Sequence, residues 1–132
     1  MILEQFPITA LATVAALLVY FFCTIKVGQA RAKHGVKPPS VEGPEEFQRV
    51  NRVHQNMVEQ LVLHIPALWI FAFAWGDFWA GVLGFIFVIG RILYAIGYYE
   101  AAEKRSRGFG LASLATIVLT LGALIGALVA IF

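Results

Sequence analysis

Four long apolar stretches divide the chain, and the polar residues gather between them. The stretches cover residues 6–27, 57–75, 78–99 and 109–132. Each is close to the roughly 20 consecutive apolar residues that a helix needs to cross a bilayer. Little chain remains outside them. The pattern therefore predicts one domain, residues 1–132, folded as an all-α integral membrane bundle of four transmembrane helices.

The first connection is the one long loop that the pattern predicts. We expect the first helix to end near Arg31, because the sequence HGVKPPSVEGPEEF that follows is dense in the glycine and proline that interrupt helices. The second helix is expected to begin at Ser40 or at the Gly43-Pro44 pair, since two glutamates follow and acidic residues favour the first turn of a helix.

The later connections are expected to be short. Pro66 falls inside the second helix and is expected to kink it, because proline removes one backbone hydrogen bond. Gly76 and Asp77 predict a tight turn into the third helix. The fourth helix is expected to begin after the sequence SRGFG. Its GALIG segment, residues 122–126, has the glycine spacing that permits close helix contact.

Composition supports the membrane interpretation. Of the 132 residues, 60% are hydrophobic and 14% are charged, and the mean hydropathy is +0.79. These values lie beyond those of an average globular chain. The N-terminal sequence MILEQFPITA has no basic leader and no cleavage pattern, so the first apolar stretch is expected to be a retained helix and not a signal peptide.

Charge placement predicts the orientation. All ten lysines and arginines fall between Lys26 and Arg107, and none lies near either terminus. The connections at residues 28–48 and 100–108 are therefore expected to face the cytoplasm, with both termini on the other side. The basic residues are split between loops of a hydrophobic bundle. A nucleic-acid partner is therefore not expected.

A polar stripe enters the second apolar stretch. At about 100° per residue, Arg49, Arg52, Asn56 and Glu59 fall within about 80° of one another on a helix. An ionisable side chain at membrane depth costs about 2.5 to 3.5 kcal/mol, so such residues are usually paired and turned towards a site. A solvated helix end explains Arg49, but it explains Asn56 and Glu59 poorly. We interpret the stripe as one wall of a pocket for a charged, water-soluble ligand.

The third helix supplies a second wall. Arg91, Tyr94 and Tyr98 stand at i, i+3 and i+7 and share one face. Tyrosines near a helix end also form interfacial aromatic belts, which leaves a second interpretation open for Tyr98. Arg91 lies deeper and needs an anionic partner, for which Glu59 is the expected candidate.

Three basic residues follow the third helix. Their ordinary interpretation is that they mark this connection as cytoplasmic; they are Lys104, Arg105 and Arg107. One of them, if it pointed into the pocket, would lower the pKa of a bound thiol and hold a thiolate ready for attack.

The three histidines and the single cysteine are not expected to form a metal or catalytic site. His34, His54 and His64 lack the spacing of a metal site, so no metal is expected. His54 lies about 160° around the helix from Asn56 and would serve a neighbouring subunit if it binds a ligand. His64 is expected to satisfy its polarity within the bundle, and the single Cys23 to be a small buried residue.

These patterns resemble a known family over nearly the whole chain. The second helix reads EFQRVNRVHQNMVEQ and carries R-x-x-x-N-x-x-E, and the third helix and its exit read RILYAIGYYEAAEKRSRGF. Together with the VKPPSVEGPEEF loop, they resemble the MAPEG superfamily, the membrane-associated proteins of eicosanoid and glutathione metabolism. The third helix is similar to the microsomal glutathione S-transferase 2 and leukotriene-C synthase branch.

The resemblance implies a homotrimer that binds glutathione between adjacent subunits near the cytoplasmic side. One subunit would hold glutathione with residues of its second and third helices, and the next subunit would add two more. The implied set is Arg52, Asn56, Glu59, Arg91, Tyr94 and Tyr98 from one subunit, with Arg31 and His54 from the next. Arg105 would stabilise the thiolate, and Arg107 is its nearby rival.

The implied function is a membrane-bound glutathione transferase that conjugates glutathione to lipophilic electrophiles arriving from the bilayer, extended to the reduction of lipid hydroperoxides. A bacterial inner membrane is the expected location. Three residues depart from the pattern. Gln60 replaces an aromatic residue, His54 is similar to the prostaglandin E synthase branch, and Met57 replaces an aspartate of that branch, which disfavours its isomerase activity.

Two other functions compete with a transferase. One is a non-catalytic lipid-binding scaffold resembling the five-lipoxygenase-activating protein, which lacks the activating arginine. The other is a small four-helix exporter, which would need an acidic residue in its pore. The first helix has no acidic residue after Glu4, and Glu59 lies opposite arginines. The scaffold is therefore the stronger alternative.

Overall fold

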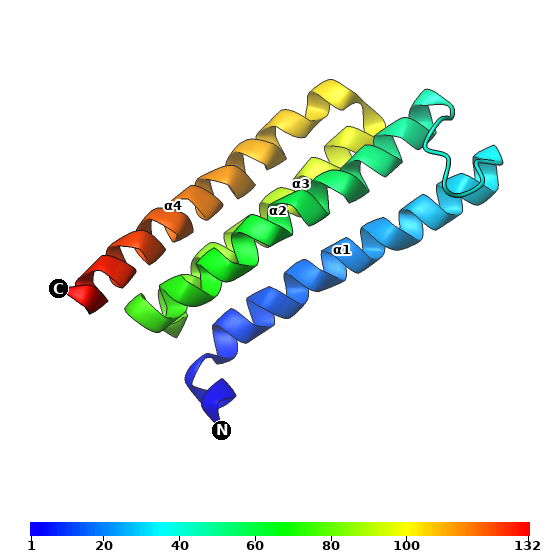
Figure 1. Cartoon of the computed structure of the whole chain (residues 1–132). Coiled ribbons are helices and arrows are strands. Elements are labelled where there is room, and N and C mark those ends of the chain that lie inside the picture. The colour runs from blue at the N-terminus through cyan, green and yellow to red at the C-terminus, as the bar shows by residue number, and fades with distance from the viewer.

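Four long helices run side by side along one axis in the computed structural model, which describes residues 1–132 (Figure 1). They are α1 (Pro7–His34), α2 (Glu45–Trp75), α3 (Asp77–Glu100) and α4 (Ser106–Ile131), with short 3-10 helices η1 (Ile2–Gln5) and η2 (Ala102–Arg105). Each of the four is long and apolar enough to cross a membrane. The predicted all-helical architecture is confirmed.

The two central helices hold the other two apart. Both α2 and α3 pack against each other and against α1 and α4, while α1 and α4 lie on opposite sides of this pair (Figure 1). Both termini lie at one end of the bundle. The α1–α2 connection and η2 lie at the other end (Figure 1). That end, which carries most of the basic residues, is called the polar end below.

The boundaries of the first connection agree closely with expectation. Helix α1 continues past Arg31 to His34 and ends where Gly35 adopts a left-handed conformation with φ 66°. Glycine adopts this conformation without a steric penalty, and it commonly ends helices. Helix α2 begins directly after Pro44, at the second of the two predicted starts.

The expected start of the last helix is wrong. Helix α4 begins at Ser106, so the SRGFG sequence forms its first turns and not a loop. Gly108 is needed there because a Cβ at this position would overlap the backbone of Tyr94 and Gly90 on α3. Glycine thus marks a close helix approach and not a break. Helix α2 contains Pro66 within one continuous element, as expected, and the kink there stays a prediction.

Close packing also explains the GALIG segment. A Cβ added at Gly122 would meet the ring of Phe71, and one added at Gly126 would meet Ala74. Both neighbours lie on α2, so the glycines let α2 and α4 approach within one chain. Cys23 is 1% exposed, as expected for a small buried residue.

The outer surface of the bundle is strongly apolar. Large side chains stand exposed on every helix, among them Leu18 on α1, Val62 on α2, Ile96 on α3 and Leu121 on α4. A soluble monomer rarely exposes such continuous apolar surface. The exposed side chains fit a bundle that lies in lipid.

One carboxylate ties the start of α1 to the α2–α3 turn. Asp77 accepts hydrogen bonds from the backbone N–H of Thr9 at 2.7 Å and of Ile8 at 3.0 Å. These two N–H groups belong to the first turn of α1. Backbone N–H groups in a first turn have no acceptor within their own helix. The carboxylate therefore caps a helix that begins far away in the sequence.

We expect Asp77→Ala to lower the free energy of unfolding by about 1 to 3 kcal/mol, because it leaves two N–H groups without acceptors. Chemical unfolding in detergent measures the loss. Asp77→Asn keeps one acceptor oxygen, so its free energy of unfolding should lie between those of the wild type and Asp77→Ala. Equal stability of all three proteins would contradict the capping role.

Candidate functional site

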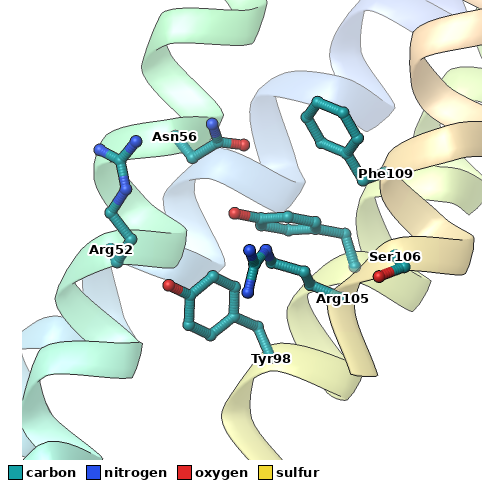
Figure 2. A pocket seen from close by; sticks show the side chains of 7 residues that line it. Arg52, Asn56, Tyr98, Arg105, Ser106 and Phe109 are labelled. Carbon is teal, nitrogen blue, oxygen red and sulfur yellow. The ribbon is translucent and has the colours of Figure 1, made fainter. Parts of the chain in front are cut away.

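A cavity opens between three helices at the polar end of the bundle. Its volume is about 490 Å³, within the range of about 300 to 1,000 Å³ typical of small-molecule pockets. The lining residues come from α2, α3, η2 and α4. They are Arg52, Asn56, Tyr94, Tyr98, Arg105, Ser106 and Phe109. Figure 2 shows Arg52 and Asn56 facing Tyr98 and Arg105 across the cavity.

Arg52 and Asn56 line the cavity from α2, and both are hydrogen-bonded to Glu59, which is not itself a lining residue. Glu59 accepts a bond from Arg52 at 3.2 Å and another from the amide nitrogen of Asn56 at 3.3 Å. Asn56 is 8% exposed, and its carbonyl oxygen Oδ1 has no hydrogen-bond partner. A buried acceptor without a partner costs free energy. The Oδ1 atom is therefore placed to accept a bond from a ligand.

The α3 wall is aromatic, with a cation behind it. The rings of Tyr94 and Tyr98 meet edge to face at 5.6 Å between centroids. Arg91 is 2% exposed, and its guanidinium carbon lies 4.1 Å from the Tyr94 ring centroid. Its Nε and Nη2 atoms lack hydrogen-bond partners. The expected ion pair between Arg91 and Glu59 is wrong, because Glu59 pairs with Arg52.

Arg105 lies at the cavity and Arg107 does not. The guanidinium carbon of Arg105 stands 5.4 Å from the ring centroid of Tyr98, and Nη1 donates a 2.6 Å bond to the carbonyl oxygen of Ala102. The ring and the carbonyl together fix its position. Arg107 lines an adjoining hollow with Glu103, Lys104 and Ser106. Of the two rival arginines, only Arg105 lines this cavity within one chain.

Two of the predicted residues lie elsewhere in the chain. Arg31 donates to the carbonyl oxygen of Ser40 at 2.7 Å, at the α1–α2 connection. The ring of His54 stacks on Tyr20 at 5.1 Å, and its Nε2 lies 3.2 Å from Thr24 Oγ1. Both therefore belong to the α1 side of the bundle, and neither lines the cavity. Their role stays a prediction that needs a second protomer.

Two lining residues, Ser106 and Phe109, were not predicted from the sequence. Both belong to the first turns of α4, where a loop was expected. Arg105 directly precedes this helix and already has helical backbone angles, so Phe109, four residues later, lies on the same face. Had the fourth helix been predicted to begin at Ser106, both residues would have been candidates for the site.

The other histidines do not join the site. His64 is fully buried, with Nδ1 3.3 Å from Thr116 Oγ1 and its ring stacked on Phe87. Its polarity is thus satisfied on one side within the bundle, although Nε2 has no partner. No group of three or more His, Cys, Asp or Glu side chains converges anywhere in the chain.

The charges of the cavity favour an anionic or zwitterionic ligand. Glu59 offsets the charge of Arg52, whereas Arg105 forms no ion pair with a carboxylate. The cavity therefore keeps a net positive charge. A permanent cation beside an open cavity attracts and stabilises anions.

Comparison with known proteins places the chain in a family. A family model described as the MAPEG family matches residues 9–125. The chain belongs to the MAPEG family. This confirms the resemblance drawn from the helix motifs. As a MAPEG protein with four helices able to cross a membrane, it is an integral, multi-pass membrane protein.

The MAPEG chain is similar to both bacterial and animal proteins. It is 50% identical over 119 residues to an uncharacterised protein of Synechocystis sp., covering 90% of this chain and 87% of the other. It is 41% identical over 105 residues to microsomal glutathione S-transferase 2 of Homo sapiens, covering 76% and 71%. Leukotriene C4 synthase of Cavia porcellus is 29% identical over 102 residues, covering 77% and 68%.

Proposed function

We propose that this MAPEG protein is a membrane-bound glutathione transferase that conjugates glutathione to lipophilic electrophiles. The observation that carries the proposal is the cavity that joins Arg52, Asn56, Tyr94, Tyr98 and Arg105. The similarity to microsomal glutathione S-transferase 2 supports glutathione as the thiol substrate.

The chemical groups of glutathione match those of the cavity. The tripeptide carries two carboxylates, one ammonium and one thiol. Arg52 offers a cation for a carboxylate, and Glu59 offers an anion for the ammonium. The free Oδ1 of Asn56 can accept a peptide N–H. One carboxylate and the ammonium of the ligand thus each have a counterpart, as charged groups taken out of water require.

The exposure of the α2 wall supports an assembly of several protomers. The side chains of Arg52 and Glu59 remain 48% and 51% exposed in the single chain. The exposed residues that follow Glu59 along α2 are apolar, beginning with Val62 and Leu63. A charged pair facing lipid would be costly. We propose a homotrimer in which the next protomer covers this pair and brings Arg31 and His54 to the ligand.

We also propose the orientation in the membrane. The polar end would face the cytoplasm, and both termini would lie on the other side of a bacterial inner membrane. The basic residues of the two connections support this arrangement. Glutathione would then enter from the cytoplasm, and the electrophile would arrive from the bilayer.

The reaction needs little beyond orientation and charge. Bound glutathione loses its thiol proton to water at the polar end, and the guanidinium of Arg105 stabilises the thiolate. The sulfur lone pair then attacks the electrophilic carbon and forms a C–S bond, while the leaving group takes the bonding electrons. Fixing both reactants lowers the entropic part of the barrier, and Arg105 lowers the electrostatic part.

The same thiolate would reduce lipid hydroperoxides. Its sulfur attacks the terminal peroxide oxygen and forms a sulfenic acid, the O–O bond breaks, and the lipid alkoxide takes a proton from water and leaves as an alcohol. A second glutathione then attacks the sulfenic sulfur and yields glutathione disulfide and water. This reaction needs no group in the protein beyond those used for conjugation.

The alternative is a lipid-binding scaffold without catalysis. The position of Arg105 at the cavity disfavours it, because a scaffold has no use for an unpaired cation beside a polar cavity. Calorimetry separates the two functions. A scaffold should show no saturable binding of glutathione, whereas a transferase should.

We expect Arg52→Gln to weaken glutathione binding about tenfold or more, because it removes a charged donor and frees Glu59 to repel a carboxylate. Titration calorimetry of the purified protein measures this change. Arg49→Gln, an equal charge change one turn earlier on α2 and outside the cavity, should bind normally. Equal weakening by both variants would show that only the overall charge matters.

A further inference from the structure

An apolar groove runs along the outer side of the bundle between α1 and α3. Its volume is about 380 Å³, and every lining side chain is hydrophobic. Leu18, Val19 and Phe22 line it from α1, and Ile92, Ala95 and Ile96 line it from α3. The groove shares no residue with the polar cavity described above.

A polar hollow continues this groove towards the polar end. Its volume is about 260 Å³, and it is lined by Lys26, Gln29 and Lys33 of α1 together with Glu46 of α2. Tyr99 lines both spaces and joins them. An apolar channel that opens into a basic hollow has the shape and polarity of a site for an amphiphile.

One lysine of the hollow has no carboxylate partner. Lys33 pairs with Glu46 at 2.8 Å. Lys26 forms no ion pair, and its Nζ instead lies 5.5 Å from the Phe22 ring centroid and 5.9 Å from that of Tyr99. The hollow therefore keeps one positive charge, which lies beside two rings that line the groove.

The groove remains open in the proposed assembly. At about 100° per residue, Leu18, Phe22, Lys26, Gln29 and Lys33 fall within about 80° of one another on α1. The face of α1 that carries Tyr20, Thr24 and Arg31 lies about 180° away from them. That opposite face is the one expected to meet the next protomer, so the groove faces lipid.

We propose that this groove binds an anionic membrane phospholipid. One acyl chain would lie between α1 and α3, and the phosphate would contact Lys26. The single positive charge of the hollow matches the net charge of an anionic headgroup, whose phosphodiester is not neutralised by a cation of its own. Basic pockets between transmembrane helices bind anionic lipid headgroups in this way. The lipid would lie on the outer side of the bundle, apart from the polar cavity.

Native mass spectrometry of the full-length protein in detergent tests the proposal. Phosphatidylglycerol and phosphatidylcholine with identical acyl chains serve as probes. We expect the wild-type protein to prefer phosphatidylglycerol, and Lys26→Gln to weaken its binding about fivefold while leaving phosphatidylcholine unchanged. Lys37→Gln makes the same charge change at an exposed residue outside the hollow, and it should bind as the wild type does.

A second variant tests the acyl chain separately. Ile96 is 60% exposed, so Ile96→Trp should fold normally and fill the groove. It is expected to weaken binding of both lipids. Equal binding of the two lipids by the wild type would overturn the proposal. So would an equal effect of Lys26→Gln and Lys37→Gln, or normal lipid binding by Ile96→Trp.

Discussion

Replacing Arg105 by alanine is expected to remove most conjugation of a model electrophile while leaving glutathione affinity within a few-fold. Arg105 stands at the cavity beside Tyr98, and its charge would act on the thiolate more than on the whole tripeptide. Loss of one electrostatic contact to a reacting centre typically slows catalysis about 10²- to 10³-fold. Steady-state turnover with a chlorinated dinitrobenzene measures the change.

Two further measurements make this prediction specific. The ultraviolet absorbance of the thiolate, formed when glutathione is added, should disappear in Arg105→Ala. Arg107→Ala removes the same charge two residues later, at a residue outside the cavity, and should keep normal turnover and thiolate formation. Full turnover in Arg105→Ala with loss in Arg107→Ala would transfer the role to Arg107.

The substitution Gly108→Ala is expected to destabilise the bundle and to reduce activity. A Cβ at residue 108 would overlap the backbone of Tyr94 and Gly90, which cannot move without shifting α3. Overpacking of this kind typically costs about 1 to 3 kcal/mol. The shift would also displace Arg105 and Phe109 from the cavity. Chemical unfolding and turnover measure the two effects.

Gly110→Ala is the matched control for this substitution. No heavy atom lies within 4 Å of a Cβ placed there, so the change meets only open space. Alanine favours a helix over glycine by about 1 kcal/mol, so the variant should be as stable as the wild type or slightly more stable. If Gly108→Ala were equally stable, the close approach of α3 and α4 would not limit the fold.

Helical periodicity explains why much of the cavity was predictable. Arg52 and Asn56 share one face of α2, and Tyr94 and Tyr98 share one face of α3, so spacing alone places each pair on a common wall. The cost of polar groups at membrane depth indicates that both walls face a site. The four spans follow equally directly from the length of the apolar stretches.

Periodicity did not reveal which partner a long side chain would choose. Spacing shows the face on which Arg91 and Glu59 stand, but it does not show their relative heights along the bundle. Arg52 and Glu59 are seven residues apart on one helix, about 10 Å along its axis. The flexible arginine spans that distance and forms the pair within α2.

The predicted start of the fourth helix was wrong because of its glycines. In soluble chains, glycine pairs often mark loops, and the sequence SRGFG was interpreted in that way. In this bundle, Gly108 is helical and permits contact with the α3 backbone. Sequence alone does not distinguish the two uses, because the partner backbone comes from a different part of the chain.

The position of the two termini has a practical consequence. Both lie at the end of the bundle opposite η2 (Figure 1), whose Arg105 lines the cavity. Helix α4 spans about 39 Å at 1.5 Å per residue. A fluorophore fused to either terminus would therefore stand far from Arg105. Stepwise photobleaching of such a fusion would count the chains in each particle and so test the proposed trimer without a label at the cavity.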